Sequence, residues 1–190
     1  EPAQTKVNIA FSDKTVDLDA SGVVEADVLK VFDASLDYGH YVEMGMPYVL
    51  KSIVMETQPQ NNLMYVWYKT NAANQISEQY LEVKYAREIP VPQSDGGSAL
   101  SRAFGISWRQ IVGKPSWPYP DRSRFSSMTG SLYLKMLSTK AIYIRYFNRG
   151  VIDTDWPDFF VNLGLPYRDM EQTTRKIFSI LAQKGAFATP

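Results

Sequence analysis

Three carboxylates within six positions are the densest group of possible ligands in this chain. They belong to the stretch DTDWPD, as Asp153, Asp155 and Asp158. A calcium loop needs more oxygen ligands in a fixed order, and the stretch does not supply them. Pro157 suits the first position of a helix, where nearby acids complement the free N–H groups and the helix dipole. We therefore interpret the stretch as a helix start that delivers the aromatic residues Trp156, Phe159 and Phe160.

Other residue sets that carry chemistry are few. The chain has no cysteine and a single histidine, His40, so thiolate zinc sites, disulfides and cysteine nucleophiles are excluded. One histidine without carboxylates at suitable spacing does not make a metal site, and we expect His40 to cap a helix or lie at the surface. No phosphate loop, dinucleotide fingerprint or nucleophile elbow occurs. We predict no metal and no cofactor, and the remaining candidates for a general acid or base are Tyr68, Tyr85, Tyr146 and Arg145.

The composition excludes some partners and emphasises aromatic packing. Lysine plus arginine equals aspartate plus glutamate at 20 each, so no long-range field attracts a nucleic acid. Aromatic residues reach 13%, and so many large rings must be packed or used. No apolar run approaches the roughly 20 residues that span a bilayer. The chain opens with Glu-Pro-Ala instead of Met, so we expect an exported protein, periplasmic or secreted, with its signal peptide removed; a cytoplasmic location is the alternative.

The apolar periodicity predicts the elements that would position these residues. Alternation over residues 16–26 predicts a half-buried strand, and from Asp27, a suitable N-cap, the period becomes helical. Further strands are predicted at 48–57, 63–70, 76–88, 103–112, 126–137 and 141–149. A helical face runs from Leu163 to Leu181, with Pro166 kinking or restarting the helix. Sequential strands with little helix between them favour an antiparallel sheet of the α+β class, in one domain of residues 1–190 with 1–14 as an N-terminal extension.

Four stretches follow one another in an informative order: DLDASGVVEADVLKVFDAS, QISEQYLEVKYARE, GSLYLKML and NRGVIDTDWPDFFVNLG. Together they resemble the START domain, the lipid-binding branch of the helix-grip superfamily that also holds polyketide cyclases and plant Bet v 1-like proteins. In that family the second stretch tends to read Val-Ser-Asn-Arg-Asp before a strand. The third has a glycine, an apolar strand and Pro-Leu, and the fourth an acidic turn, Gly-Trp-Leu-Pro and a helix opening with Val-Asn. The resemblance covers residues 16–184 as the helix-grip core.

The resemblance implies a curved antiparallel sheet wrapped around a long C-terminal helix, with a hydrophobic cavity between them. Counting alternate residues from Gln79, we predict that the cavity is lined by two neighbouring strands at Val66, Tyr68, Gln79, Leu81, Val83 and Tyr85. Val66 and Tyr68 are chosen over Tyr65 and Trp67, although an error of one residue would reverse a strand. Apolarity adds Leu132, Leu134, Ile144 and Tyr146, and the helix would form the roof with Phe160, Leu163, Met170 and Thr174.

One departure from the family bears on the ligand. Where many members have an Arg-Asp pair, this chain has Gln79 and Tyr80. The resemblance implies that the arginine faces the cavity, so Gln79 replaces a buried charge with a neutral amide. We therefore expect a neutral or weakly polar ligand instead of one with a charged head group.

The irregular segment 113–124, GKPSWPYPDRSR, is a candidate gate. Gly113 would act as a flexible joint and three prolines would stiffen the segment as a lid. The rings of Trp117 and Tyr119 would rest on the cavity mouth and make transient contact with a membrane surface. The alternative is a static loop that pins both rings onto the end of the barrel.

Three functional hypotheses follow. The first is non-catalytic binding and transport of one hydrophobic molecule, such as a sterol, fatty acid, phospholipid or polyketide, in an internal cavity. The second is a cyclase, aromatase or lyase that uses the same cavity, and it requires acid–base groups that converge inside. The third is an interaction module with a solid core, which requires a flat exposed aromatic patch and no connected cavity.

Overall fold

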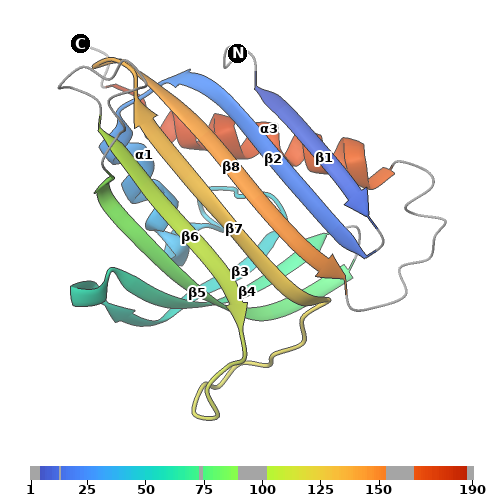
Figure 1. Ribbon diagram of the computed structural model, residues 1–190. Helices are drawn as coiled ribbons and strands as arrows, with labels where there is room; N and C mark the ends of the chain where they lie inside the picture. The colour runs from blue at the N-terminus through green and yellow to red at the C-terminus, as the bar shows by residue number, and fades with distance from the viewer. Residues whose placement is uncertain (1–4, 13, 73–74, 90–101, 153–164, 188–190) are drawn as a thin grey trace.

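The computed structural model describes residues 5–12, 14–72, 75–89, 102–152 and 165–187. Within them, eight strands form one antiparallel sheet in the order β1-β2-β8-β7-β6-β5-β4-β3 (Figure 1). The strands are β1 (Lys6–Ser12), β2 (Thr15–Glu25), β3 (Val49–Gln58), β4 (Leu63–Ala72), β5 (Gln75–Ile89), β6 (Ala103–Ile111), β7 (Phe125–Met136) and β8 (Ala141–Ile152). The antiparallel α+β class predicted from the sequence is confirmed.

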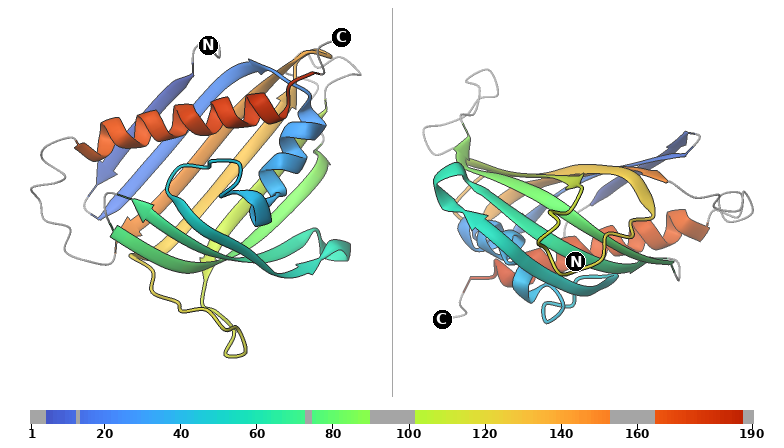
Figure 2. Two further views of the ribbon diagram at one scale, coloured as in Figure 1. Left: turned by 180° about the vertical axis from the view of Figure 1, so that it is seen from behind. Right: turned by 90° about the horizontal axis from the view of Figure 1, so that it is seen from below.

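Within the described ranges, the α-helices α1 and α3 lie on one face of the sheet, as Figure 2 shows from behind. Helix α1 (Val28–Leu36) begins at the predicted cap, where the Asp27 carboxylate accepts hydrogen bonds from the backbone N–H groups of Leu29 and Lys30. The long helix α3 (Leu165–Lys184) carries Pro166 as its second residue, a position where proline's missing N–H costs nothing. Short 3-10 turns occur at η1 (Tyr38–His40) and η2 (Pro59–Asn61).

The N-terminal segment differs from the expectation. Residues 1–14 were predicted as an extension, but β1 pairs with β2 along its whole length, from Lys6 opposite Ser21 to Ser12 opposite Thr15. The alternation of Val7, Ile9 and Phe11 with smaller or polar residues carries the signal for this strand, since these three side chains are the partly buried ones. Residues 6–12 of the expected extension are therefore the edge strand of the sheet.

The core lies between the helices and the inner face of the sheet. The strand pairing places Tyr68 opposite Gln79 and Trp67 opposite Tyr80, so Val66 and Tyr68 share the inner face with Gln79 and Leu81. Val66 and Tyr68, chosen over Tyr65 and Trp67, thus lie on the same face as Gln79. At the end of the sheet next to α1, Phe32 fills the core, with its ring centroid 5.2 Å from Phe104 and 6.5 Å from Tyr85.

Candidate ligand-binding pocket

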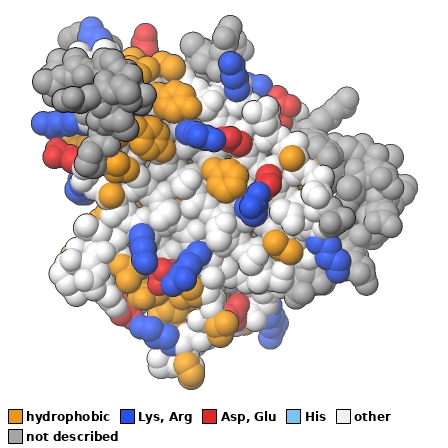
Figure 3. All heavy atoms as spheres, in the orientation of Figure 1, with side chains coloured by type: hydrophobic (Ala, Val, Ile, Leu, Met, Phe, Trp, Pro, Cys, Tyr) orange, Lys and Arg blue, Asp and Glu red, His pale blue; other side chains and the backbone are white. Residues whose placement is uncertain are grey.

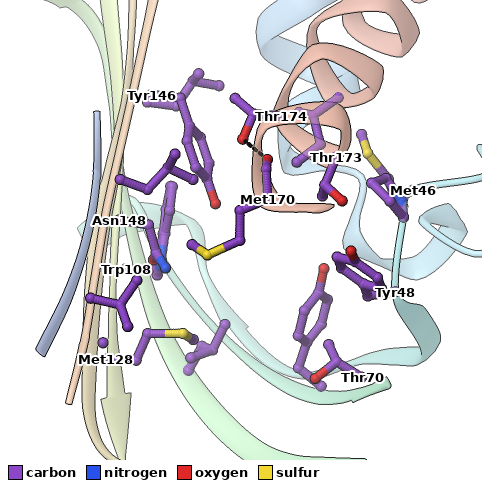
Figure 4. A pocket seen from close by; sticks show the side chains of 18 of the residues that line it. Met46, Tyr48, Thr70, Trp108, Met128, Tyr146, Asn148, Met170, Thr173 and Thr174 are labelled. Atoms are coloured by element: carbon purple, nitrogen blue, oxygen red, sulfur yellow. Dashed lines mark hydrogen bonds between the residues drawn. The ribbon is translucent and has the colours of Figure 1, made fainter. Parts of the chain in front are cut away.

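A pocket of about 300 Å³ opens between the inner face of the sheet and the segments that cover it. Helix α3 forms one cover, and the segment from Tyr38 to Tyr48, which follows α1, forms the other. The pocket lies toward the end of the sheet that α1 leaves uncovered, and Figure 4 shows Met170 projecting from α3 into its middle. The size falls at the lower end of small-molecule sites, which hold one compact ligand.

The structure places the predicted lining residues in three groups. On the pocket wall lie Tyr68, Gln79, Leu81, Leu132, Tyr146, Met170 and Thr174. On the same inner face, but packed into the core where α1 fills the space, lie Val66, Val83, Tyr85, Leu134 and Ile144. These five are not among the residues that line the pocket, and Tyr85 packs instead against Phe32 of α1. Phe160 and Leu163, like the helix start expected at residues 153–160, lie outside the described residues.

Several wall residues were missed from the sequence. Trp108 on β6 and Asn148 on β8 face the pocket, and continuing the alternation of Ile144 and Tyr146 by one step would have found Asn148. Tyr38, Tyr41 and Tyr48 also line it. They belong to an irregular segment whose place over the sheet has no local sequence signal.

Trp108 and Asn148 form a polar pair across an intervening strand. The Trp108 indole N–H donates to Asn148 Oδ1 at 3.1 Å, although β7 runs between their two strands. Gly130 of β7 makes this possible, since a Cβ at that position would lie 2.3 Å from the indole ring. The indole also packs on Tyr146, with 5.5 Å between ring centroids. Gly130 is thus a position where close approach requires glycine.

Gln79 is a buried amide on the opposite part of the wall. It is 2% exposed, and its Oε1 accepts a hydrogen bond from the Ser123 hydroxyl at 3.0 Å. Its Nε2 donates to the sulfur of Met128 at 3.8 Å, a weak acceptor. The expectation that a neutral amide faces the cavity at this position agrees with its place on the wall.

A cluster of tyrosines forms the side of the pocket between β4 and the segment after α1. The rings of Tyr38 and Tyr41 stack at 4.5 Å, and Tyr68 meets both edge-on at 6.3 Å. The Tyr41 hydroxyl donates to the Ser35 carbonyl at 2.5 Å. Burial raises the pKa of the Tyr38, Tyr41 and Tyr68 hydroxyls well above the ordinary value, and it raises the pKa of Tyr146 to about 12. All four hydroxyls therefore stay protonated at neutral pH.

Tyr48 lies where the pocket opens between α3 and β4, near Thr70 and Thr173 (Figure 4). Its backbone adopts φ 64°, the left-handed region that is strained for a bulky side chain. Burial, with the neighbouring Asp169 carboxyl of α3, raises the pKa of Tyr48 to about 12. Asp169 is exposed to solvent and is the only charged residue among the described residues of the wall.

Two acid–base candidates are excluded by their positions. Arg145 lies on the outer face of the sheet, where its guanidinium makes two hydrogen bonds to the Asp19 carboxylate at 3.0 and 2.8 Å. Tyr85 packs beside Phe32 in the core. The single histidine, His40, is exposed and pairs with Asp37 at 2.7 Å, which agrees with the surface role expected for it. No group of metal-binding side chains occurs among the described residues.

The part of the segment 113–124 that carries Trp117 and Tyr119 packs on the outer face of the sheet, and the expectation that these rings rest on the pocket mouth is wrong. Tyr119 stacks on Trp67 at 4.6 Å, and Trp117 lies 4.9 Å from Tyr80, between ring centroids. These partners face away from the pocket because they alternate with the inward residues Tyr68 and Gln79. Gly113 serves close packing, since a Cβ there would lie 2.4 Å from the Tyr80 ring.

Hydrogen bonds and cations hold this loop in place. The Tyr80 hydroxyl donates to the Tyr119 carbonyl at 2.6 Å, and the Trp67 indole donates to the Pro120 carbonyl at 2.9 Å. The Lys114 ammonium lies 5.0 Å from the ring centre of Trp117. Figure 3 shows cationic side chains around a hydrophobic area at the lower end of this face. The contacts anchor the loop, and its movement as a gate stays a prediction.

We expect the substitution Trp117→Ala to lower the free energy of unfolding by about 1–2 kcal/mol, because it removes a half-buried aromatic contact and a cation–π partner. Ligand affinity should stay unchanged, since the ring lies on the far side of the sheet. Chemical denaturation and ligand titration measure the two effects. Val112→Ala is the control, as Val112 is 88% exposed on the same loop. If Trp117→Ala changed the rate of ligand transfer between vesicles without lowering stability, the result would support the hypothesis that this loop acts as a gate.

The curved antiparallel sheet and the long helix that crosses its inner face define the START/Bet v 1-like helix-grip fold. Several solved structures of START proteins have the same fold. Human STARD10 is similar with a TM-score of 0.66 and 10% identity, over 93% of this chain and 73% of that one. A STAR-related lipid transfer protein from Xanthomonas axonopodis matches with a TM-score of 0.58 and 12% identity, over 90% and 98%. The ZhuI aromatase/cyclase from a Streptomyces species matches with a TM-score of 0.59 and 14% identity, over 90% and 93%.

Comparisons at the level of sequence add no closer relative. No family model matches the chain, and no curated protein matches it at a significant level. At 10–14% identity, the structural likeness shows the fold alone. The similar structures include both lipid transfer proteins and aromatase/cyclases, so the fold is compatible with binding and with catalysis.

Proposed function

We propose that the protein binds one hydrophobic small molecule in the pocket under α3 and carries it without covalent chemistry. The observation that carries this proposal is the wall itself, which is mainly apolar and whose described polar groups are neutral apart from Asp169 at the opening. Burying about 300 Å² of apolar ligand surface would contribute about 7 kcal/mol. The cost of ordering the ligand reduces this gain, so micromolar affinity is expected.

The pocket argues against a solid-cored interaction module. Its size also narrows the list of hydrophobic ligands, because about 300 Å³ suits one compact ring system or a single acyl chain better than a phospholipid with two chains. Among the described helices, none is long and apolar enough to cross a membrane. Export, and transient contact with a membrane surface, remain part of the proposal.

The aromatase/cyclase alternative is supported by the fold and by two tyrosines, Tyr68 and Tyr146, which both line the pocket. A general base works best when its pKa lies near the working pH. Burial raises the pKa of both hydroxyls, to about 12 for Tyr146, and this moves them away from that role. Binding is therefore favoured over catalysis.

We expect the purified protein to take up a fluorescent fatty acid or sterol saturably and to release a bound hydrophobic molecule on gentle extraction. Leu132→Trp should weaken uptake at least tenfold, because Leu132 lies on the pocket wall and a larger ring would occupy the ligand's volume. Fluorescence titration and mass spectrometry make the measurements. Val54→Trp on the exposed part of β3 is the matched control. An absence of both saturable uptake and extractable ligand would contradict the proposal.

A further inference from the structure

Two amide side chains on the pocket wall have their oxygen atoms already engaged by the protein. The indole of Trp108 can only donate, so its contact with Asn148 fixes the amide oxygen on that side. The Ser123 hydroxyl accepts a hydrogen bond from the Phe125 backbone N–H and donates to the amide oxygen of Gln79. In each amide, the NH2 group is therefore the part that can donate a hydrogen bond to a ligand.

Neither NH2 group has a strong acceptor among the described residues. The Gln79 group meets only the thioether of Met128 at 3.8 Å, and no hydrogen bond from the Asn148 Nδ2 is present in the part of the chain that the structure describes. Gln79 is 2% exposed, so bulk water does not readily replace the missing acceptor. A ligand carbonyl oxygen is a stronger acceptor than a thioether sulfur, so a hydrogen bond from either NH2 group to such an oxygen would favour binding.

Other polar groups of the wall add donors. The hydroxyls of Tyr68 and Tyr146 line the pocket in protonated form, and each has a hydrogen to donate. By contrast, the hydroxyls of Ser35 and Thr174 are engaged as donors to backbone carbonyls of their own helices. The wall therefore offers several hydrogen-bond donors to a ligand oxygen, two of them amide NH2 groups.

Charge narrows the ligand further. No lysine, arginine or histidine occurs among the described residues of the wall. A carboxylate or phosphate ligand would accept the same hydrogen bonds, but burying its charge without a cation is costly. A neutral carbonyl oxygen accepts hydrogen bonds and carries no such penalty.

We propose that the pocket selects an uncharged, compact, apolar molecule that carries carbonyl oxygens, such as a ketone, quinone or ester, and that Asn148 and Gln79 donate to those oxygens. This inference rests on the proposed function and specifies its ligand class. The Trp108–Asn148 pair fixes the donor on β8, and the contacts of Gln79 with the Ser123 hydroxyl and the Met128 sulfur orient the donor on β5. Met170 from α3 reaches between the walls and would pack on the apolar body of the ligand (Figure 4).

The test compares two ring-matched probes, anthraquinone and anthracene, in a double-mutant cycle. The wild-type protein, Asn148→Leu and Gln79→Met are titrated with both. Each substitution should lower the ratio of quinone affinity to anthracene affinity by about fivefold, as expected for one neutral hydrogen bond. Anthracene reports any general damage to the pocket, and taking the ratio cancels the difference in hydrophobicity between the probes. Asn61→Leu in η2, away from the pocket, should leave the ratio unchanged.

A second readout needs no variant. In the wild-type protein the infrared carbonyl stretch of bound anthraquinone should lie at a lower frequency than in an apolar solvent, because hydrogen bonds weaken the C=O bond. An unshifted band overturns the inference, and so does a ratio that neither substitution changes while both probes bind. If neither probe binds and no other hydrophobic molecule is taken up, the proposed function itself fails, which is a distinct result.

Discussion

Phe178→Ala is expected to lower the free energy of unfolding by about 3–5 kcal/mol, a loss typical of a buried ring in a well-packed core. Phe178 is 0% exposed and lies on the face of α3 that meets the sheet. Its ring approaches β2 at Gly22, where a Cβ would lie 3.6 Å from it. Because α3 contacts β1, β2 and α1, loss of this ring loosens the cover of the pocket as well as the core.

Denaturant unfolding followed by circular dichroism measures the effect. Lys176→Ala on the exposed face of the same helix is the control and should change stability by less than about 0.5 kcal/mol. Ligand uptake should fall in the Phe178 variant, since the pocket depends on the position of α3. A stability loss below about 1 kcal/mol would mean that α3 does not pack on the sheet through this ring.

Alkaline pH is expected to unfold the protein steeply through its buried tyrosines. Burial raises the pKa of Tyr38, Tyr41, Tyr68 and Tyr146 above the value of 10.0 for an unperturbed tyrosine. Above pH 10 the unfolded chain loses these protons while the folded protein keeps them, so unfolding becomes more favourable as the pH rises. Each such tyrosine contributes a slope of about 1.4 kcal/mol per pH unit.

The stabilising contribution is complete below pH 10 and is lost progressively as the pH rises toward the folded pKa, which is about 12 for Tyr146. Free energies of unfolding measured between pH 8 and pH 11, roughly spanning the unfolded tyrosine pKa, should show the decline begin near pH 10. Tyr146→Phe should make the decline of the unfolding free energy with pH less steep by the contribution of one tyrosine, about 1.4 kcal/mol per pH unit. If a spectrophotometric titration found these tyrosines ionising near pH 10 in the folded protein, the cluster could not be buried as described.

Much of the architecture follows from local patterns. The alternation through β4 and β5 identified the inner face, because side chains of a strand point to opposite sides in strict turn. Asp27 capped its helix as expected, because a short carboxylate reaches the free N–H groups of the first turn. The same alternation is present in the sequence at Val7, Ile9 and Phe11 of β1 and at Asn148 of β8. Both features could therefore have been predicted from the sequence, although they were not.

The pocket itself depended on the tertiary structure. Alternation says which side of the sheet a residue faces, but not what covers it: Val83 and Ile144 are buried in the core, while Tyr68 and Tyr146 lie on the pocket wall. The Trp108–Asn148 bond exists because Gly130 leaves room across a third strand, a relation between residues 40 positions apart in the chain.

The class of fold, the inner face of the central strands and the neutral amide at Gln79 all follow from residue type and period. Two placements do not: the segment after α1 brings tyrosines over the sheet, and Trp117 and Tyr119 pack on the outer face of the sheet. These placements depend on sheet curvature and on contacts between distant segments. A local pattern contains neither, because the same aromatic residues in a loop can pack equally well on either side until their partners are in place.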